Sequence, residues 1–144
     1  MSARLKRAAR LTALAEKALT SARARVAEAQ RAARAAASDA ERQENAWAEA
    51  SQQFAKTVEF AGDLATEAAH LRTLRLRADA GAKRASEAMT AERHSTELVI
   101  EAERDRRKLE LWQERLTATE REQETLVERK ASDELAARTA RGRQ

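Results

Sequence analysis

The feature that most constrains the fold is an apolar seam that runs from Leu5 to Leu71 with a seven-residue period. Two positions of each heptad are apolar or small, and Thr12, Gln43 and Thr57 are the interruptions. The two series are Leu5, Thr12, Leu19, Val26, Ala33, Ala40, Trp47, Phe54, Ala61 and Ala68, and Ala8, Ala15, Ala22, Ala29, Ala36, Gln43, Ala50, Thr57, Leu64 and Leu71. Alternating spacings of three and four over this many heptads predict a helix that supercoils with a partner helix.

The composition favours helix over almost the whole chain. Proline is absent, and the three glycines are Gly62, Gly81 and Gly142. Charged residues make up 36% of the chain and aromatic residues 3%, and much of the apolar content is alanine. Because alanine buries little area, and burial contributes only about 25 cal/mol per Å², a thick globular core is excluded and a thin core between two helices is not. The sequence therefore predicts an all-α fold.

The predicted architecture is a single helical hairpin over residues 1–144, with two long helices in an antiparallel coiled coil. Helix one is expected over about 3–60, the reversal over about 61–63, and helix two over about 64–140.

Two glycines compete for the reversal. Gly62 can take a positive φ after a helix, and Asp63 can cap the helix that follows. Gly81 is the other candidate, but a single glycine within a helix costs only about 1 kcal/mol. We therefore place the reversal at Gly62, and we expect Ser2 to cap helix one.

The apolar pattern of the second helix is less regular. It begins with Leu64, Leu71, Ala78, Ala82, Ala85 and Met89, and it resumes with Leu98, Ala102, Leu109, Trp112, Leu116 and Leu126. The intervening Glu92 and Thr96 are polar, and the two halves are out of phase. Such a slip predicts a stutter near residues 92–98.

Charge distinguishes two ways of covering the seam. Residues 1–34 carry nine Lys or Arg and two Asp or Glu, residues 39–70 carry two and seven, and residues 71–93 carry six and three. In a hairpin that reverses at Gly62, residue i faces roughly residue 125 minus i, so opposite signs face each other along most of the length. A parallel homodimer would place the basic segment against its own copy. The sequence predicts a monomeric hairpin whose second helix extends about 20 residues beyond the first.

Several functions find no support in the residues. There is no cysteine, the two histidines are His70 and His94, and there is no glycine-rich phosphate loop or HExxH spacing. We therefore expect no enzyme activity, no cofactor, no metal site and no small-molecule substrate. No apolar run approaches the roughly 18 residues of a membrane span, and the basic start MSARLKRAARL lacks an apolar signal core, so a cytoplasmic protein is expected.

The basic first third of the chain has more than one interpretation. It can be a solvated face paired with helix two, or a surface that docks an acidic protein. Binding of nucleic acid is an unlikely alternative, because no aromatic side chain is interleaved with the basic ones, and an anionic membrane surface is another. A generic scaffold is a third class of function.

Aromatic residues gather near the expected reversal, where three of the four are found: Trp47, Phe54 and Phe60. Trp47 and Phe54 lie on the seam and are expected to hold the two helices together. By the same seven-residue spacing, Phe60, Leu74 and Leu76 do not lie on the seam. Exposed apolar side chains at the end of a hairpin are candidates for a partner contact.

The second helix carries a resemblance to a known family. RRKLELWQERL at 106–116, followed by KASDELAARTARGR at 130–143, resembles the C-terminal part of the flagellar type III export protein FliJ. The N-terminal Leu, Ala and Arg heptads, the Gly-Asp-Leu at 62–64 and the total length are also similar to that family. The related injectisome stalk proteins of the YscO/SctO type share this architecture.

The resemblance implies a non-enzymatic central stalk of a type III export ATPase complex. In that family both chain ends lie in the pore of the hexameric export ATPase, and the hairpin tip contacts the export-gate membrane protein, with export chaperones as further partners. Such a protein is peripheral at the cytoplasmic face of the inner membrane. The residues implied to face the ATPase are Arg4, Lys6, Arg7, Leu11, Leu135, Arg138 and Arg141. Those implied to face the export gate are Phe60, Leu71, Leu74 and Leu76.

Overall fold

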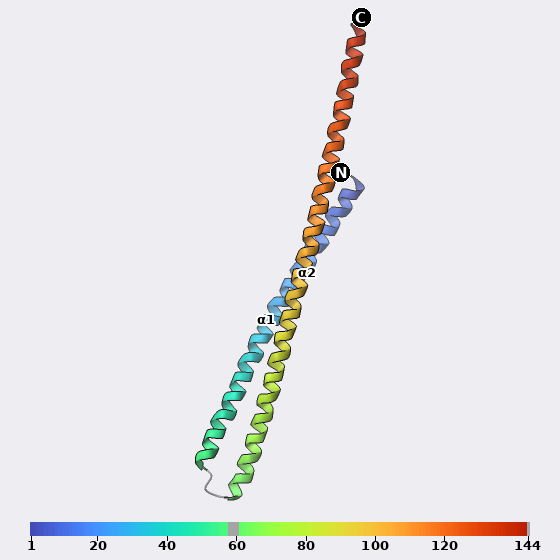
Figure 1. Ribbon diagram of the computed structural model, residues 1–144. Coiled ribbons are helices and arrows are strands. Elements are labelled where there is room, and N and C mark those ends of the chain that lie inside the picture. The colour runs from blue at the N-terminus through green and yellow to red at the C-terminus, as the bar shows by residue number, and fades with distance from the viewer. Residues whose placement is uncertain (58–60, 144) are drawn as a thin grey trace. The chain divides into compact units, whose positions relative to one another are not determined.

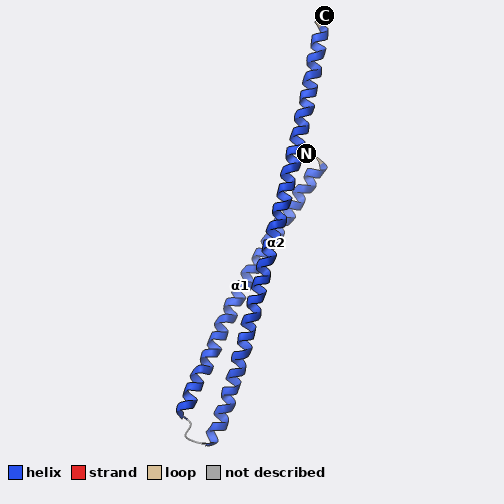
Figure 2. Cartoon of the chain, in the orientation of Figure 1, coloured by secondary structure: helices blue, strands red, loops and turns tan. Residues whose placement is uncertain are grey.

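Two long helices form the whole of the described structure, a computed structural model that describes residues 1–57 and 61–143. Helix α1 spans Ala3–Thr57 and helix α2 spans Ala61–Gly142 (Figure 1). No strand occurs among the described residues, as Figure 2 shows. The two helices pack against each other, which confirms the predicted all-α fold of two long helices.

The start of α1 is capped as predicted. The backbone N–H of Leu5 donates a hydrogen bond to Ser2 Oγ at 3.1 Å, and the N–H of Lys6 donates to the Ser2 carbonyl at 3.1 Å. Ser2 is therefore the residue that satisfies the first free N–H groups of the helix.

The reversal differs in position from the prediction. Helix α1 ends at Thr57, and α2 already includes residues 61–63, the segment in which the turn is expected. Phe60 lies outside the described residues. Gly62 was expected to end a helix, but it is part of α2. One glycine within a helix lowers its stability by only about 1 kcal/mol relative to alanine, which a long helix tolerates.

The chain divides into two compact units, each of which contains a segment of both helices. Unit 1 comprises Met1–Thr20 and Glu101–Gln144, and unit 2 comprises Ser21–Ile100. In unit 1 the N–H of Ser2 donates to Glu120 Oε1 at 3.1 Å, and in unit 2 Arg75 contacts Glu44. The paired residue numbers add up to 122 and 119, so the pairing within each unit is antiparallel and lies a few residues from the predicted register.

The seam of α1 agrees with the prediction. From Leu5 to Phe54, every residue of the two series is buried or half-buried. The most deeply buried are Ala8, which is 0% exposed, and Leu19, which is 2% exposed. Thr12 interrupts the apolar pattern without leaving a polar group unpaired, because its Oγ1 donates to the Ala8 carbonyl at 2.9 Å.

The predicted stutter in α2 is absent from the burial pattern. Arg75, Glu110 and Thr117 are half-buried beside the seam. The seam itself is an unbroken series of buried and half-buried residues at spacings of three and four: Leu71, Leu74, Ala78, Gly81, Ala85, Ala88, Glu92, Ser95, Val99, Ala102, Arg106, Leu109, Gln113, Leu116 and Glu120. Apolar residues that the prediction placed on the seam, Ala82, Met89, Leu98 and Trp112, are exposed. The regular heptads of α1 impose this register, in which Glu92 and Arg106 are half-buried. Arg106 Nε is buried and lies 3.5 Å from Glu110 Oε1.

Beyond Glu120, α2 has no partner helix within its unit. Every described residue from 121 to 143 is exposed. The predicted extension of about 20 residues is therefore present, because α1 begins at Ala3, beside Glu120.

Candidate interaction surfaces

Unit 2 contains a polar cluster that joins the two helices. Arg75 Nη1 and Nη2 donate to Glu44 Oε1 and Oε2, both at 3.0 Å, which is a bidentate pair. Arg75 Nε and Nη2 also donate to Asp79 Oδ1 at 3.0 and 2.8 Å, and the guanidinium lies 4.6 Å from the centre of the Trp47 ring. The hydrogen bonds to Glu44 and then to Asp79 raise the pKa of Arg75 above its ordinary value. The guanidinium therefore stays charged, and its bonds to Glu44 link α2 to α1 at this level.

Six residues further along α2 from Arg75, a glycine faces a polar side chain. A Cβ placed on Gly81 would collide with Gln43 Oε1 and would lie 3.5 Å from Ala40 Cα. Gln43 Oε1 is buried and has no hydrogen-bond partner among the described residues. Gly81, the competing candidate for the reversal, is instead a buried position of the seam where the absence of a side chain admits the Gln43 amide.

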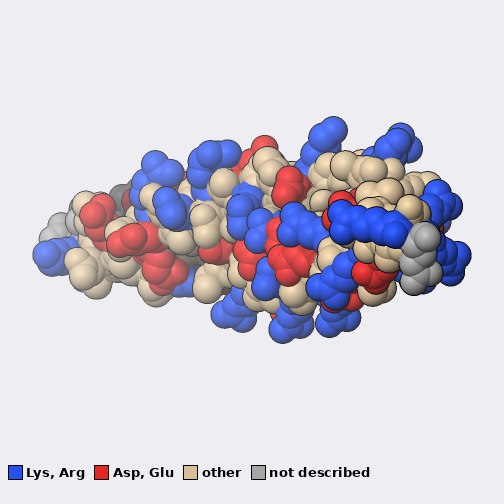
Figure 3. Space-filling view, turned by 90° about the horizontal axis from the view of Figure 1, so that it is seen from above, with Lys and Arg blue, Asp and Glu red and all other residues tan. Residues whose placement is uncertain are grey.

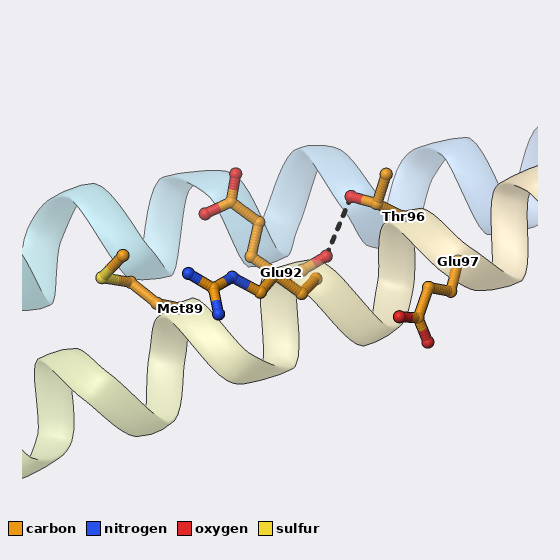
Figure 4. A pocket seen from close by; sticks show the side chains of 5 residues that line it. Met89, Glu92, Thr96 and Glu97 are labelled. Carbon is orange, nitrogen blue, oxygen red and sulfur yellow. Dashed lines mark hydrogen bonds between the residues drawn. The ribbon is translucent and has the colours of Figure 1, made fainter.

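The residues described show no cluster of metal-binding side chains. No group of three or more His, Cys, Asp or Glu side chains within this part of the chain is arranged to hold a metal ion. His70 and His94 are both exposed. The furrow on α2 drawn in Figure 4 is lined by Met89, Glu92, Arg93, Thr96 and Glu97 from one helix, with a hydrogen bond from Thr96 Oγ1 to the Glu92 carbonyl at 2.9 Å. That bond is an ordinary helix contact, so the furrow is a stretch of helix surface and offers no convergent polar groups to a ligand.

The residues implied to face the ATPase fall into two groups. Arg4, Lys6 and Arg7 are exposed and Leu11 is half-buried at the start of α1, whereas Leu135, Arg138 and Arg141 are exposed near the end of α2. Because the start of α1 lies beside Glu120, about 15 residues of helix separate the two groups, which is roughly 22 Å at 1.5 Å per residue. The structure therefore does not bring the two groups together into one patch.

Between these groups lies a groove that the sequence interpretation missed. It is lined by Met1, Ser2, Glu120, Gln123, Glu124, Val127 and Glu128. Three of these are glutamates spaced four residues apart on α2, so the spacing in the sequence could have revealed an acidic stripe. The stripe begins at Glu120, beside the start of α1, so its exposure depends on the relative lengths of the two helices. Those lengths could be predicted from the sequence only approximately.

The residues implied to face the export gate have different environments. Leu71 and Leu74 are half-buried on the seam, and Leu76 is 70% exposed. The expectation that Leu74 lies off the seam is wrong, because the register imposed by α1 turns it toward the partner helix. Phe60 lies outside the described residues. Among the three gate-facing residues that the structure describes, Leu76 is the exposed one.

Further apolar side chains are exposed on α2 beyond those expected. Leu111 is 36% exposed, Trp112 is 38% exposed, and Leu126, Val127 and Leu135 are 54 to 66% exposed. Trp47 and Phe54 are half-buried on the seam, as predicted. Figure 3 shows Lys and Arg side chains projecting from the surface with Asp and Glu between them. The surface thus combines mixed charge with separate apolar residues.

Comparison with known proteins adds no relative. No family model matches the chain, and neither a curated protein nor a solved structure matches it. Among the described residues, no helix has the length and apolar character needed to cross a membrane. The class that fold and surface define is a two-helix antiparallel hairpin with an exposed continuation of its second helix.

Proposed function

We propose that this protein is a non-enzymatic central-stalk component of a type III protein export ATPase complex of the flagellar kind. In this role it links the hexameric export ATPase to the export-gate membrane protein from the cytoplasmic face of the inner membrane. The observation that carries the proposal is the continuation of α2 beyond Glu120 to Gly142 as a single exposed helix, whose final turns contain Arg138 and Arg141 and no acidic residue. A slender helix with a basic end suits insertion into a ring pore lined by acidic side chains, where charge sets orientation and speeds encounter.

Two further features support the proposal. The resemblance of 106–116 and 130–143 to FliJ covers the same helix that continues beyond α1. Both helical segments that lead to the chain ends belong to unit 1, as expected if both engage one partner.

Capture by the export ATPase tests the proposal most directly. The full chain, immobilised, is expected to retain a hexameric flagellar export ATPase. Exchanging Arg138 and Arg141 for Glu places like charges opposite the acidic pore and is expected to abolish capture. The matched control exchanges Arg121 and Arg129 for Glu, which changes the net charge by the same amount nearer the start of the extension and is expected to weaken capture less. Failure of the unaltered chain to retain the ATPase would overturn the proposal.

The gate contact has its own test. Leu76 is the exposed member of the gate-facing set, so Leu76→Glu is expected to abolish capture of the export gate's cytoplasmic domain while ATPase capture persists. Leu64, which is 37% exposed on the same helix, provides the control substitution. If Leu64→Glu lowers capture of the gate domain as much as Leu76→Glu does, the loss reflects destabilisation of this part of the helix pair, and Leu76 makes no specific contact. Export and motility in a deletion strain, with the proton gradient intact, then test coupling itself.

A further inference from the structure

The outer face of α1 in unit 1 carries a straight basic stripe. Lys6, Arg10, Leu14 and Lys17 follow one another at spacings of four, four and three residues, so they lie on one side of the helix. All four are exposed, and Leu14 is 60% exposed. The buried residues Ala8, Thr12 and Leu19 occupy the opposite side, against α2. The stripe therefore points away from the partner helix over roughly 16 Å of α1.

The charges of this stripe are not neutralised within the protein. Over the described part of the chain, Lys6, Arg10 and Lys17 have no ion-pair partner, in contrast to Arg75, Arg106 and Arg107, which pair with carboxylates. Glu16 is the single acidic residue of 1–20, and it lies off the stripe. The expectation that helix two neutralises this segment does not apply to these three side chains. Their full charge is available to an anionic partner.

We propose that this face of α1 binds the surface of an anionic phospholipid bilayer. Three cations in line with an exposed leucine match such a surface, because Lys and Arg each gain about 1 kcal/mol near acidic headgroups and an apolar side chain can enter the headgroup boundary. Bound in this way, α1 lies along the membrane plane with α2 on its far side.

Leu14 decides between a bilayer and the other polyanion that cations attract, a nucleic acid. A phosphate backbone offers an exposed leucine no apolar partner, and the stripe contains no Asn, Gln or aromatic side chain that could read or stack on a base. At a bilayer, burial of the Leu14 side chain among the lipids adds to the free energy of binding. The inference goes beyond the proposed function. Lys6 belongs to both surfaces, but Arg10, Leu14 and Lys17 are not among the residues proposed to face the ATPase, so variants at these three positions test the stripe alone.

Sedimentation with vesicles tests the inference on the full chain. Vesicles of 30% phosphatidylglycerol in phosphatidylcholine are expected to bind the protein, and vesicles of phosphatidylcholine alone are not. The double variant Arg10→Gln/Lys17→Gln is expected to lower the partition coefficient about 25-fold, since about 1 kcal/mol per charge is close to fivefold. Leu14→Gln is expected to lower it roughly tenfold without changing its salt dependence. Circular dichroism checks that both variants stay helical, as expected for exposed positions.

A charge-matched control separates the stripe from net charge. Arg138→Gln/Arg141→Gln removes the same charge at the end of α2 and is expected to leave vesicle binding within twofold. An equal loss in this control, or no binding to the anionic vesicles, overturns the proposal. So does binding of a DNA duplex that the Arg10/Lys17 variant loses and Leu14→Gln retains, because the stripe would then be a phosphate-backbone surface. Retention of the export ATPase by the Arg10/Lys17 variant keeps a failure here distinct from a failure of the proposed function.

Discussion

Two segments of α2 differ in burial although both are continuous, charged helix. Between Leu71 and Glu120 a residue is buried or half-buried every three or four positions, whereas 121–143 is exposed at every position. The second segment still contains Leu126, Val127 and Leu135, so apolar content alone does not decide burial. The difference lies in the partner, because α1 begins beside Glu120. The burial pattern of α2 is thus set by α1 more than by its own apolar residues.

The largest expected effect that follows from this comparison is in amide hydrogen exchange. A lone helix of about 23 residues is marginally stable in water, whereas the segment packed on α1 opens only with its partner. Exchange measured by mass spectrometry is expected to be at least about a hundredfold faster in 121–143 than in 101–120. Similar protection in the two segments would mean that 121–143 has a partner in solution. Addition of the export ATPase is expected to slow exchange in 121–143 if the proposed function holds.

Truncation of a seam leucine is expected to have the next largest effect. Leu19 is 2% exposed, and Leu19→Ala removes buried methyl groups and leaves a cavity, so the free energy of unfolding should fall by about 2 to 5 kcal/mol. The matched control is Leu135→Ala in the unpaired segment, where the side chain is 66% exposed and the change should stay within about 0.5 kcal/mol. Urea denaturation followed by circular dichroism gives both values. Equal effects would contradict the assignment of the seam.

The same comparison explains what the sequence could and could not predict. Helix α1 was predictable because its Leu and Ala heptads are regular, and the buried Ala8, Leu19 and Ala33 all lie where that spacing places them. The seam of α2 could not be predicted in the same way, because Glu92 and Arg106 are half-buried in the register that α1 imposes, while Leu98 and Trp112 are exposed.

The candidate surfaces likewise contain features that could be predicted from the sequence and features that could not. That Arg4, Lys6 and Arg138 are exposed could be predicted, since charged residues away from an apolar seam face solvent. The contacts of Arg75 with Trp47 and Glu44 could not, because a long side chain can reach several residues across a helix pair and small differences in register decide which it meets. The acidic groove beside Ser2 was missed for a related reason, since it exists only where α1 begins.

A smaller effect is expected from filling the space at Gly81. In an open helix, Gly→Ala gains about 1 kcal/mol, but at Gly81 the new Cβ requires the Gln43 amide to move. Gly81→Ala is therefore expected to gain less than this in the natural chain and close to the full 1 kcal/mol in a Gln43→Ala background. A double-mutant cycle in urea measures the coupling between the two positions. Gly142→Ala, which meets no atom within 4 Å, is the control for the unpaired segment, and additive effects at 43 and 81 would contradict the close packing.

The smallest effect is expected from the exposed ion pair of unit 2. Arg75→Lys keeps the charge but loses the two parallel bonds to Glu44 and the flat contact with Trp47, which a lysine ammonium cannot reproduce. Because the pair is partly exposed and screened by solvent, the thermal midpoint should fall measurably but by less than in the Leu19 variant. Arg129→Lys in the unpaired segment should leave the midpoint unchanged. If the two substitutions lower it equally, the Arg75 cluster contributes nothing beyond its charge, and the alanine-rich seam alone would hold α2 against α1 in unit 2.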